Sequence, residues 1–217
     1  MLFAFTSTNM YTPKLTRETN WDTIATFIRD NGFGLLINVD DAGVPHATHI
    51  PMTLVEKTPG TFVLHGHIAR INPQWEYFSK GDTLAVFSGH HAYISSSWYE
   101  KEKIPTWNYM AVHIHGQIRI QDEAEMVAAL GSLMDHYEAA SACPVHITDI
   151  DDKTLQNNVK AIVGFELSIR DVNANYKLSQ NKKDTDYYSV IAHLRALGDE
   201  NSLRVAAEME ARRTAEK

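Results

Sequence analysis

The apolar positions of the chain follow a helical spacing near its start and an extended spacing soon afterwards. Residues 18–30 place apolar side chains three and four positions apart, and Asn31-Gly32 ends that pattern. Extended apolar runs follow, separated by turns rich in Asp, Gly and Pro, at residues 34–39, 45–55 and 61–68. The pattern predicts an amphipathic helix followed by a β-meander of three strands.

The rest of the chain alternates strands and helices. Alternation is clearest at residues 109–121, where apolar side chains from Met110 to Ile120 occupy the face expected in the core. The other predicted elements are a short helix with Pro73 in its first turn at 72–79, strands at 82–88 and 161–169, and helices at 123–139, 187–197 and 201–213. Six or more strands with helices outside them predict a mainly β fold with peripheral helices, a closed or nearly closed antiparallel barrel.

Composition narrows the class of protein. The chain has 217 residues, of which 44% are hydrophobic and 22% charged, so it can bury a full core. Its net charge of -7 gives no general attraction to nucleic acid. Cys143 is the only cysteine, which leaves no internal disulfide and no cysteine-based zinc site. No apolar run approaches the ~18 residues of a membrane span, and we expect a cytoplasmic protein.

Common nucleotide and hydrolase motifs do not occur in the sequence. A G-x-G-x-x-G turn after a strand, a G-x-x-x-x-G-K-[ST] loop and a G-x-S-x-G elbow are all missing. The sequence therefore supports neither a dinucleotide-binding doubly wound sheet nor an α/β-hydrolase site. No residue is an evident catalytic acid or base.

Eleven histidines raise the question of a metal site. The pairs His65/His67 and His113/His115 each place two imidazoles on one face of a predicted strand. No carboxylate at an evident spacing completes such a site, and pairs of this kind also arise on polar strand faces. We therefore expect hydrogen-bonded imidazoles and no metal, and we keep a His-metal-binding barrel as an alternative.

The end of the third predicted strand is suited to a phosphate group. Gly66 allows close approach of a ligand, Arg70 offers a guanidinium fork, and amides near Asn72 begin a helix. Pro51 on the neighbouring strand removes a backbone donor, so we expect the sheet to be interrupted there. The alternative interpretation of Arg70 is a surface ion pair.

Residues 90–109 combine aromatic rings with hydroxyl groups at unusual density. The segment contains Tyr93, Ser95, Ser96, Ser97, Trp98, Tyr99, Trp107 and Tyr109. This mixture suits a planar ligand with polar edges or a close contact between subunits. An aromatic-rich core strand beside a surface loop is the alternative.

Several motifs together resemble one family. They occupy residues 10–14, 47–52, 66–75, 92–99, 105–109, 162–166 and 176–181. In this order they are similar to the PaiB family, which is described as FMN-binding negative transcriptional regulators. The resemblance implies an FMN-binding split-barrel domain over residues 10–200, an extension over 1–9 and a C-terminal helical tail over 201–217. It also implies an architecture similar to that of pyridoxamine-phosphate oxidases and flavin reductases. By that resemblance the protein would be a homodimer with FMN at the subunit interface.

The resemblance also implies the residues that hold the cofactor. The isoalloxazine ring would lie along Thr48, His49, Ile50, Pro51 and Met52. The ribityl chain and phosphate would be reached by His67, Ala69, Arg70 and Asn72. Side chains that come from the partner subunit or close the pocket would be Tyr93, Ser95, Ser96, Trp98 and Trp107. Lys177 completes the set, in a stretch that resembles the Arg-Leu-Ser-Pro of the oxidases with Lys for Arg and Gln180 for Pro. That departure argues against a pyridoxal-type substrate.

Three functional hypotheses follow from the sequence. The first is an FMN-binding dimer that acts as a regulator or flavin sensor. The second is an FMN-dependent oxidoreductase or flavin reductase that uses a reduced nicotinamide. The third is a flavin-free or metal-binding barrel whose aromatic segment serves the dimer contact. Direct DNA binding is not expected, because no predicted helix has the character of a recognition helix.

Overall fold

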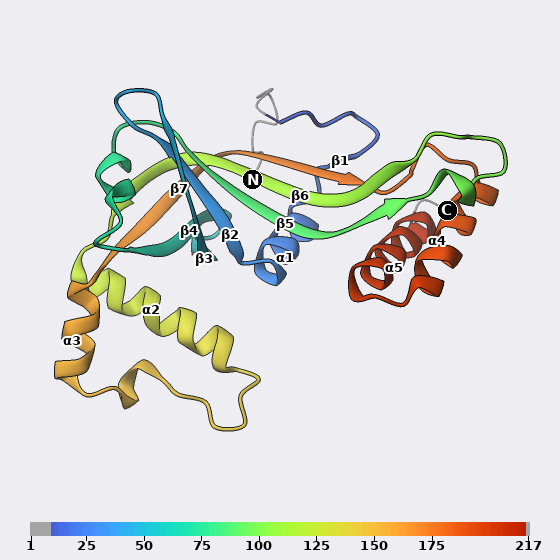
Figure 1. Ribbon diagram of the computed structural model, residues 1–217. Coiled ribbons are helices and arrows are strands. Elements are labelled where there is room, and N and C mark those ends of the chain that lie inside the picture. The colour runs from blue at the N-terminus through green and yellow to red at the C-terminus, as the bar shows by residue number, and fades with distance from the viewer. Residues whose placement is uncertain (1–9, 216–217) are drawn as a thin grey trace. The chain divides into compact units, whose positions relative to one another are not determined.

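The structure is a computed structural model that describes residues 10–215, and these form two compact units (Figure 1). The first unit contains residues 28–87 and 114–172. The described part of the second contains residues 10–27, 88–113 and 173–215. The extension predicted over residues 1–9 lies outside the described residues.

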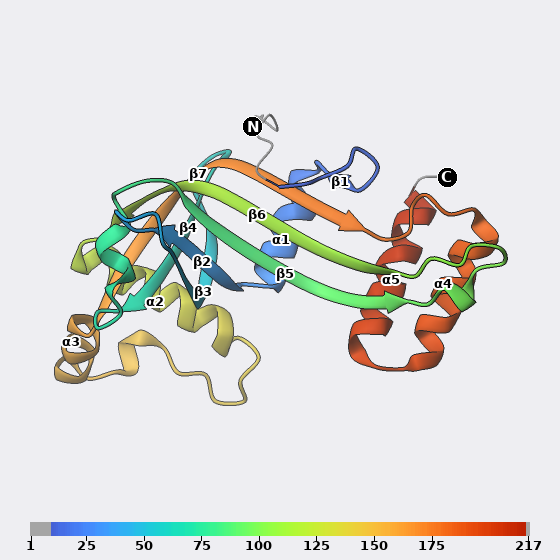
Figure 2. The same cartoon turned by 45° about the horizontal axis from the view of Figure 1, so that its top comes forward.

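The described residues contain one antiparallel sheet of seven strands in the order β1-β7-β4-β3-β2-β5-β6. The strands are β1 (Arg17–Glu18), β2 (Phe33–Val39), β3 (Pro45–Thr58), β4 (Thr61–Ala69), β5 (Thr83–Ile94), β6 (Thr106–Ile120) and β7 (Ile162–Lys177). A further pairing between β7 and β6 closes the sheet into a barrel, with β1 added outside on β7. Figure 2 shows β5, β6 and β7 running alongside one another. The predicted antiparallel barrel is confirmed.

The β-meander of the first unit forms as the sequence pattern predicts. β2 pairs with β3 from Phe33↔Pro51 to Val39↔Pro45. The turn between them is held by Asp40, whose Oδ1 accepts the backbone N–H of Val44 at 2.9 Å. Alternate residues of these strands point inward to the core, which also contains large side chains of β5 and β7. The fully buried set includes Leu36, Leu64, Phe87, Phe165 and Leu167.

The helices of the first unit begin at well-formed caps. Helix α2 (Glu123–Glu138) starts with a capping box, in which Asp122 Oδ1 accepts the Glu125 N–H at 2.9 Å and Glu125 Oε2 accepts the Asp122 N–H at 3.1 Å. The short helical pieces η1 (Pro73–Tyr77) and η3 (Ile147–Asp149) and helix α3 (Asp152–Lys160) complete this unit. The helices predicted at 72–79 and 123–139 are therefore confirmed, the first as a single 3₁₀ turn capped by Asn72.

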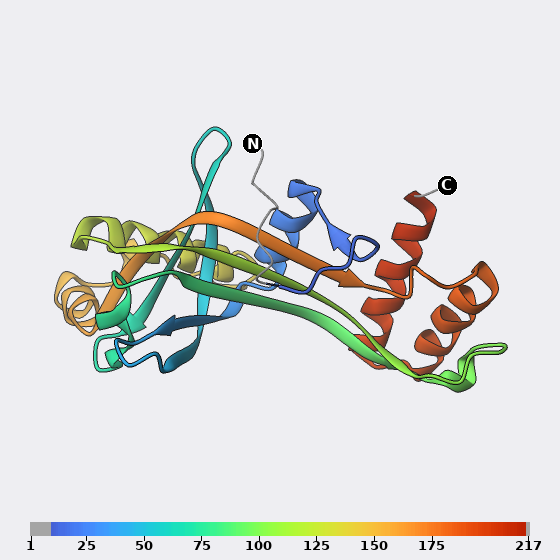
Figure 3. The same ribbon diagram turned by 90° about the horizontal axis from the view of Figure 1, so that it is seen from above.

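The second unit contains the C-terminal helices. Helices α4 (Asp184–Leu197) and α5 (Glu200–Ala215) lie side by side, as Figures 1 and 3 show. The Tyr187 hydroxyl donates to the carbonyl oxygen of Met209 at 2.6 Å and joins them. α5 is polar in sequence, yet Val205, Ala206 and Met209 are fully buried. The short helix η2 (Ser96–Trp98) belongs to this unit, and helix α1 (Trp21–Asp30) contributes residues to both units.

Two expectations about the strands differ from the structure. The strand predicted at 161–169 continues as β7 to Lys177, because beyond Arg170 its side chains are buried on both faces, Asn173 and Asn175 included. Polar residues buried in this way hide the alternation that marks a strand. Ile120, placed on the core face by its spacing, is 49% exposed because it ends β6.

Candidate functional site

β3 and β4 separate from each other at Pro51. The two strands pair from Met52↔Gly66 to Thr58↔Thr61. Residues 45–51 of β3 pair with β2 alone, and β4 beyond Gly66 pairs with β7 alone, as His67↔Gly164 and the two pairs after it. Among the residues that the structure describes, the split leaves two facing strand edges without a ladder partner. The interruption predicted at Pro51 is confirmed, because proline has no N–H to continue the ladder.

The backbone of β3 presents polar groups to this split. The Met52 N–H donates to the carbonyl oxygen of Gly32 at 2.8 Å, on the β2 side. Because successive residues of an antiparallel strand point their N–H groups to opposite edges, those of Thr48 and Ile50 also face β2. The N–H of His49 then faces the open edge. An extended polar ligand can hydrogen-bond there without disturbing the sheet.

A side-chain network lies beside the part of β3 that does not pair with β4. Asn72 Nδ2 donates to Thr48 Oγ1 at 3.0 Å, and the Thr48 hydroxyl donates to Gln74 Oε1 at 2.6 Å. Gln74 is 1% exposed and donates to the carbonyl oxygen of Leu36 at 3.1 Å and to Asn38 Oδ1 at 3.0 Å. The sequence placed Thr48 and Asn72 in the site but missed Gln74, which connects both of them to β2.

Arg70 is tied to the turn between α3 and β7. Its Nε donates to the carbonyl oxygen of Lys160 at 2.8 Å, and its Nη2 donates to that of Ile162 at 2.7 Å. The guanidinium lies 6.0 Å from the ring centre of Trp75. These bonds fix the plane of the guanidinium, and Nη1 takes no part in either of them. Both partners are backbone carbonyls, so the structure gives Arg70 a tethering role that the sequence did not suggest.

A groove beside the split has one polar wall and one apolar wall. The strand wall contains Pro51, Thr53, His65, Gly66 and His67, and the other contains Gln121 and the α2 residues Met126, Ala129, Leu130 and Leu133. Gln121 is 7% exposed, and its Oε1 is buried without a hydrogen-bond partner among the described residues. Burial lowers the pKa of His67, so its imidazole is neutral at pH 7. The groove itself encloses only about 10 Å³, so it can border a ligand at the split but cannot hold a planar ring by itself.

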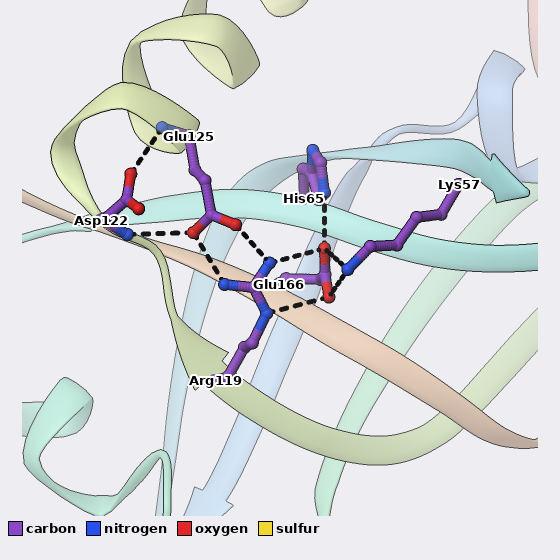
Figure 4. A network of polar contacts seen from close by, with 6 residues as sticks. All are labelled: Lys57, His65, Arg119, Asp122, Glu125 and Glu166. Atoms are coloured by element: carbon purple, nitrogen blue, oxygen red, sulfur yellow. Dashed lines mark hydrogen bonds and ion pairs between the residues drawn. The ribbon is translucent and has the colours of Figure 1, made fainter.

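A buried carboxylate organises the charged groups next to this groove (Figure 4). Glu166 on β7, with a side chain only 5% exposed, accepts from Lys57 Nζ at 2.8 Å and from Arg119 Nε at 3.0 Å. His65 Nε2 lies 3.3 Å from Glu166 Oε2. Arg119 also bonds both oxygens of Glu125 at 2.7 Å. Glu166 therefore orients His65, which lines the groove, and fastens β7 to β3, β4 and β6, while Arg119 extends the network to the start of α2.

The pKa values of the two carboxyls follow from these contacts. Burial alone would raise the pKa of Glu166, but hydrogen bonds from Arg119, Lys57 and His65 outweigh it and lower that pKa to about 2. The hydrogen bonds from Arg119 likewise lower the pKa of Glu125 to about 2. Both groups are ionised at neutral pH, so the network carries two negative charges facing Arg119 and Lys57.

The remaining candidate residues lie in the second unit. The rings of Tyr93 and Trp107 are 5.8 Å apart and are 48% and 53% exposed. Ser95 Oγ accepts the N–H of Ser97 at 3.2 Å and so caps η2, while Trp98 stacks on His193 at 5.1 Å. Ser96 is half-buried in η2, and Lys177 ends β7. The structure thus divides the candidate residues between the two units. In the first unit Ile50 and Met52 are buried in the core, and in the second Tyr93 is paired with Trp107 on an exposed surface.

The histidine pairs do not form a metal cluster in the structure. His65 contacts Glu166, and burial lowers the pKa of His115. Within residues 10–215 no group of three or more His, Cys, Asp or Glu side chains is placed to hold a metal ion.

Over the same range no helix is long and apolar enough to cross a membrane.

Comparison with known sequences gives one family. The family model described as "Putative FMN-binding domain" matches residues 10–171. The protease synthase and sporulation protein PAI 2 of Bacillus subtilis is 40% identical over 202 residues, which cover 93% of this chain and 97% of that protein. An uncharacterized protein of Aspergillus fumigatus is 27% identical over 256 residues, covering 94% and 97% of the two chains.

Comparison with solved structures gives the same barrel. The FAD and heme binding protein of Mycobacterium smegmatis superposes with a TM-score of 0.60 at 15% identity, over 80% of each chain. The flavocytochrome Anf3 of Azotobacter vinelandii also has a TM-score of 0.60, at 16% identity, over 84% of this chain and 80% of that one. At such identities the likeness establishes the fold, a split barrel, and nothing further.

Proposed function

We propose, because the chain belongs to the PaiB family of FMN-binding proteins, that FMN binds at the split between β3 and β4. The observation that carries the proposal is the pair of unpaired strand edges, beside which the buried Gln121 Oε1 has no partner among the described residues. Buried polar atoms are normally satisfied, so a ligand with hydrogen-bond donors fits this place.

We assign different parts of the cofactor to different groups of candidate residues. The isoalloxazine ring is assigned to the strand that contains Thr48, His49, Ile50, Pro51 and Met52. The ribityl chain and phosphate are assigned to His67, Ala69, Arg70 and Asn72. The exposed pair of Tyr93 and Trp107 supports a contact between two copies of the chain, through which Ser95, Ser96, Trp98 and Lys177 would reach or close the partner's pocket. A homodimer is therefore part of the proposal.

FMN supplies a centre that accepts and donates hydride or single electrons when it is bound. The contribution of the chain is binding and orientation. The neutral imidazole of His67 can donate or accept one hydrogen bond, and Glu166 holds His65 in the lining of the groove. No side chain of the groove is assigned to acid or base chemistry.

We assign the flavin a regulatory or sensing role, without direct contact to DNA. Two arginines near the C-terminus are already paired, since Arg212 bonds Glu18 and Glu208, and Arg213 bonds Asp184. Arginines engaged in this way are not free to bind phosphates. The cytoplasmic location stays a prediction from the sequence.

The test of the proposal is an absorbance spectrum of the purified protein, recorded before and after addition of FMN and desalting. We expect the two flavin bands to be retained at a ratio approaching one flavin per chain. Loss of all flavin on desalting at every loading concentration would leave the barrel intact and remove the cofactor assignment. Oxidation of NADH or NADPH by the flavin-loaded protein, well above that by free FMN, would move the assignment from a sensor to an oxidoreductase.

Arg70→Ala is expected to weaken FMN binding by about 1.5 to 3 kcal/mol, if Nη1 holds the phosphate through a charged hydrogen bond. The affinity is measured by quenching of flavin fluorescence during titration with protein. Arg29→Ala is the matched control, because Arg29 is an exposed arginine in the last turn of α1. An unchanged affinity together with a lower unfolding midpoint would limit Arg70 to tethering the carbonyls of Lys160 and Ile162.

A further inference from the structure

The second unit contains a cavity of about 340 Å³ beside the end of β7. This volume is in the range of pockets for small molecules. Its polar lining includes Glu102, Lys177, Ser179, Asn181 and Lys182, and its apolar lining includes Leu15 and Ile104. All of these residues belong to one unit, so the cavity is formed within that unit.

The cavity contains one uncompensated positive charge. Lys182 is paired with Glu102, and its ammonium lies 4.4 Å from the ring centre of Tyr99. Lys177 Nζ instead donates to the neutral hydroxyl of Thr106 at 2.5 Å. Within residues 10–215 no carboxylate lies at ion-pair distance from Lys177. A half-buried ammonium without a counter-charge attracts an anion.

The wall that holds Lys177 is fixed by a strained turn. Ser179 has φ +60°, a left-handed conformation that non-glycine residues rarely adopt, and it is 4% exposed. Its hydroxyl donates to Asn108 Oδ1 at 3.0 Å, and Gln180 Oε1 accepts the N–H of Leu178 at 2.7 Å. Backbone strain that is held in place by such contacts is concentrated at binding sites.

The apolar part of the lining is open to solvent. Leu15 is 58% exposed and Ile104 is 71% exposed. We propose that this cavity binds a small organic anion, with its carboxylate or phosphate group against Lys177 and its apolar body against Leu15 and Ile104. The proposal goes beyond the flavin, since none of the groups that carry it belongs to the split between β3 and β4. Only Lys177 is shared with the proposed flavin site, and here it serves a separate ligand.

The test uses benzoate and phenyl phosphate as probes and benzyl alcohol as their neutral counterpart. Dissociation constants are measured by ligand-observed NMR with the full chain. We expect saturable binding of at least one anion and none of benzyl alcohol, and Lys177→Gln is expected to weaken the anion about tenfold or more. Lys183→Gln is the matched control, since this exposed lysine lies outside the cavity and makes no capping bond. Whichever of benzoate and phenyl phosphate has the lower dissociation constant shows whether the cavity prefers a carboxylate or a phosphate.

A second variant changes a residue other than Lys177, so the test does not depend on whether Lys177→Gln folds correctly. Ile104→Glu changes an exposed side chain and is expected to weaken the anion by a similar factor through charge repulsion. Equal binding of benzyl alcohol and benzoate, or unchanged binding by Lys177→Gln, would overturn the proposal. The proposal would also be overturned if Lys177→Gln lost FMN and the unsubstituted protein bound none of the probes. Lys177 would then be assigned to the flavin site alone. Flavin absorbance is recorded for every variant, so failure of the FMN assignment is detected separately.

Discussion

Gly116→Ala is expected to lower the free energy of unfolding by about 3 kcal/mol or more. A Cβ on Gly116 would lie 2.1 Å from the carbonyl oxygen of Ser168 and 2.7 Å from Leu167 Cδ2. The oxygen belongs to the backbone of β7, so no rotation of a side chain relieves the contact. β6 and β7 would have to move apart where they pair to close the barrel.

Two other glycines provide graded controls for this prediction. Gly81→Ala meets no atom within 4 Å and is expected to change the free energy of unfolding by at most about 0.5 kcal/mol. Gly164→Ala meets only side-chain atoms, Met126 Cγ at 2.7 Å and Gln121 Oε1 at 2.9 Å, and an intermediate loss is expected. Urea unfolding followed by circular dichroism measures all three. Equal midpoints for the Gly116 and Gly81 variants would contradict the close approach of β6 and β7.

The barrel and part of its site were predictable because they depend on local signals. Alternating apolar residues fix the strands, and Pro51 marks the place where β3 and β4 separate. Asn72 and Pro73 begin the 3₁₀ turn as their capping chemistry requires. Each of these signals lies within a few residues of the feature that it specifies, so reading along the sequence is sufficient.

Glu166 and Gln74 were missed because their roles depend on contacts between distant strands. Glu166 meets Lys57 across 109 positions of sequence, and Gln74 reaches Leu36 across 38. The residues next to Glu166 and Gln74 in the sequence do not indicate that these two side chains are buried and make several hydrogen bonds. The tether of Arg70 to Lys160 has the same origin, since donor and acceptor are separated by 90 in residue number.

The cavity of the second unit could be predicted only in part. The stretch from Tyr176 to Asn181 was recognised as a motif, and Lys177 was selected in it. The lack of a counter-charge on Lys177 among the described residues and the left-handed backbone of Ser179 depend on how the turn packs against Thr106 and Asn108. A sequence shows which charges are present, whereas only the fold shows which of them are neutralised.

Glu166→Gln is expected to lower the free energy of unfolding at pH 7 by about 2 to 3 kcal/mol. The amide keeps the shape of the side chain but removes the charge that Arg119, Lys57 and His65 face. The loss is smaller than for a fully buried ion pair, because the Arg119 and Lys57 side chains are 42% and 50% exposed and water solvates them in part. Urea unfolding at pH 7 gives the value.

Glu125→Gln is the matched control, since Glu125 contacts the same Arg119 from an exposed position. Its loss is expected to be clearly smaller than that of Glu166→Gln, because exposed ion pairs contribute little. Equal losses in the two variants would show that burial of the Glu166 carboxylate is not what makes the network strong.

The same network fixes how stability depends on pH. The folded protein holds the pKa of Glu166 at about 2, below its ordinary value of 4.5, so between these values the unfolded chain binds more protons. The free energy of unfolding therefore falls as the pH is lowered from about 5 towards 2, and the contribution of Glu166 is fully present only above that window. Glu166→Gln is expected to flatten this slope while leaving a part that comes from Glu125, whose pKa is also about 2. Urea unfolding at several pH values measures the slope, and an unchanged slope in the variant would mean that Glu166 is not held ionised by Arg119 and Lys57.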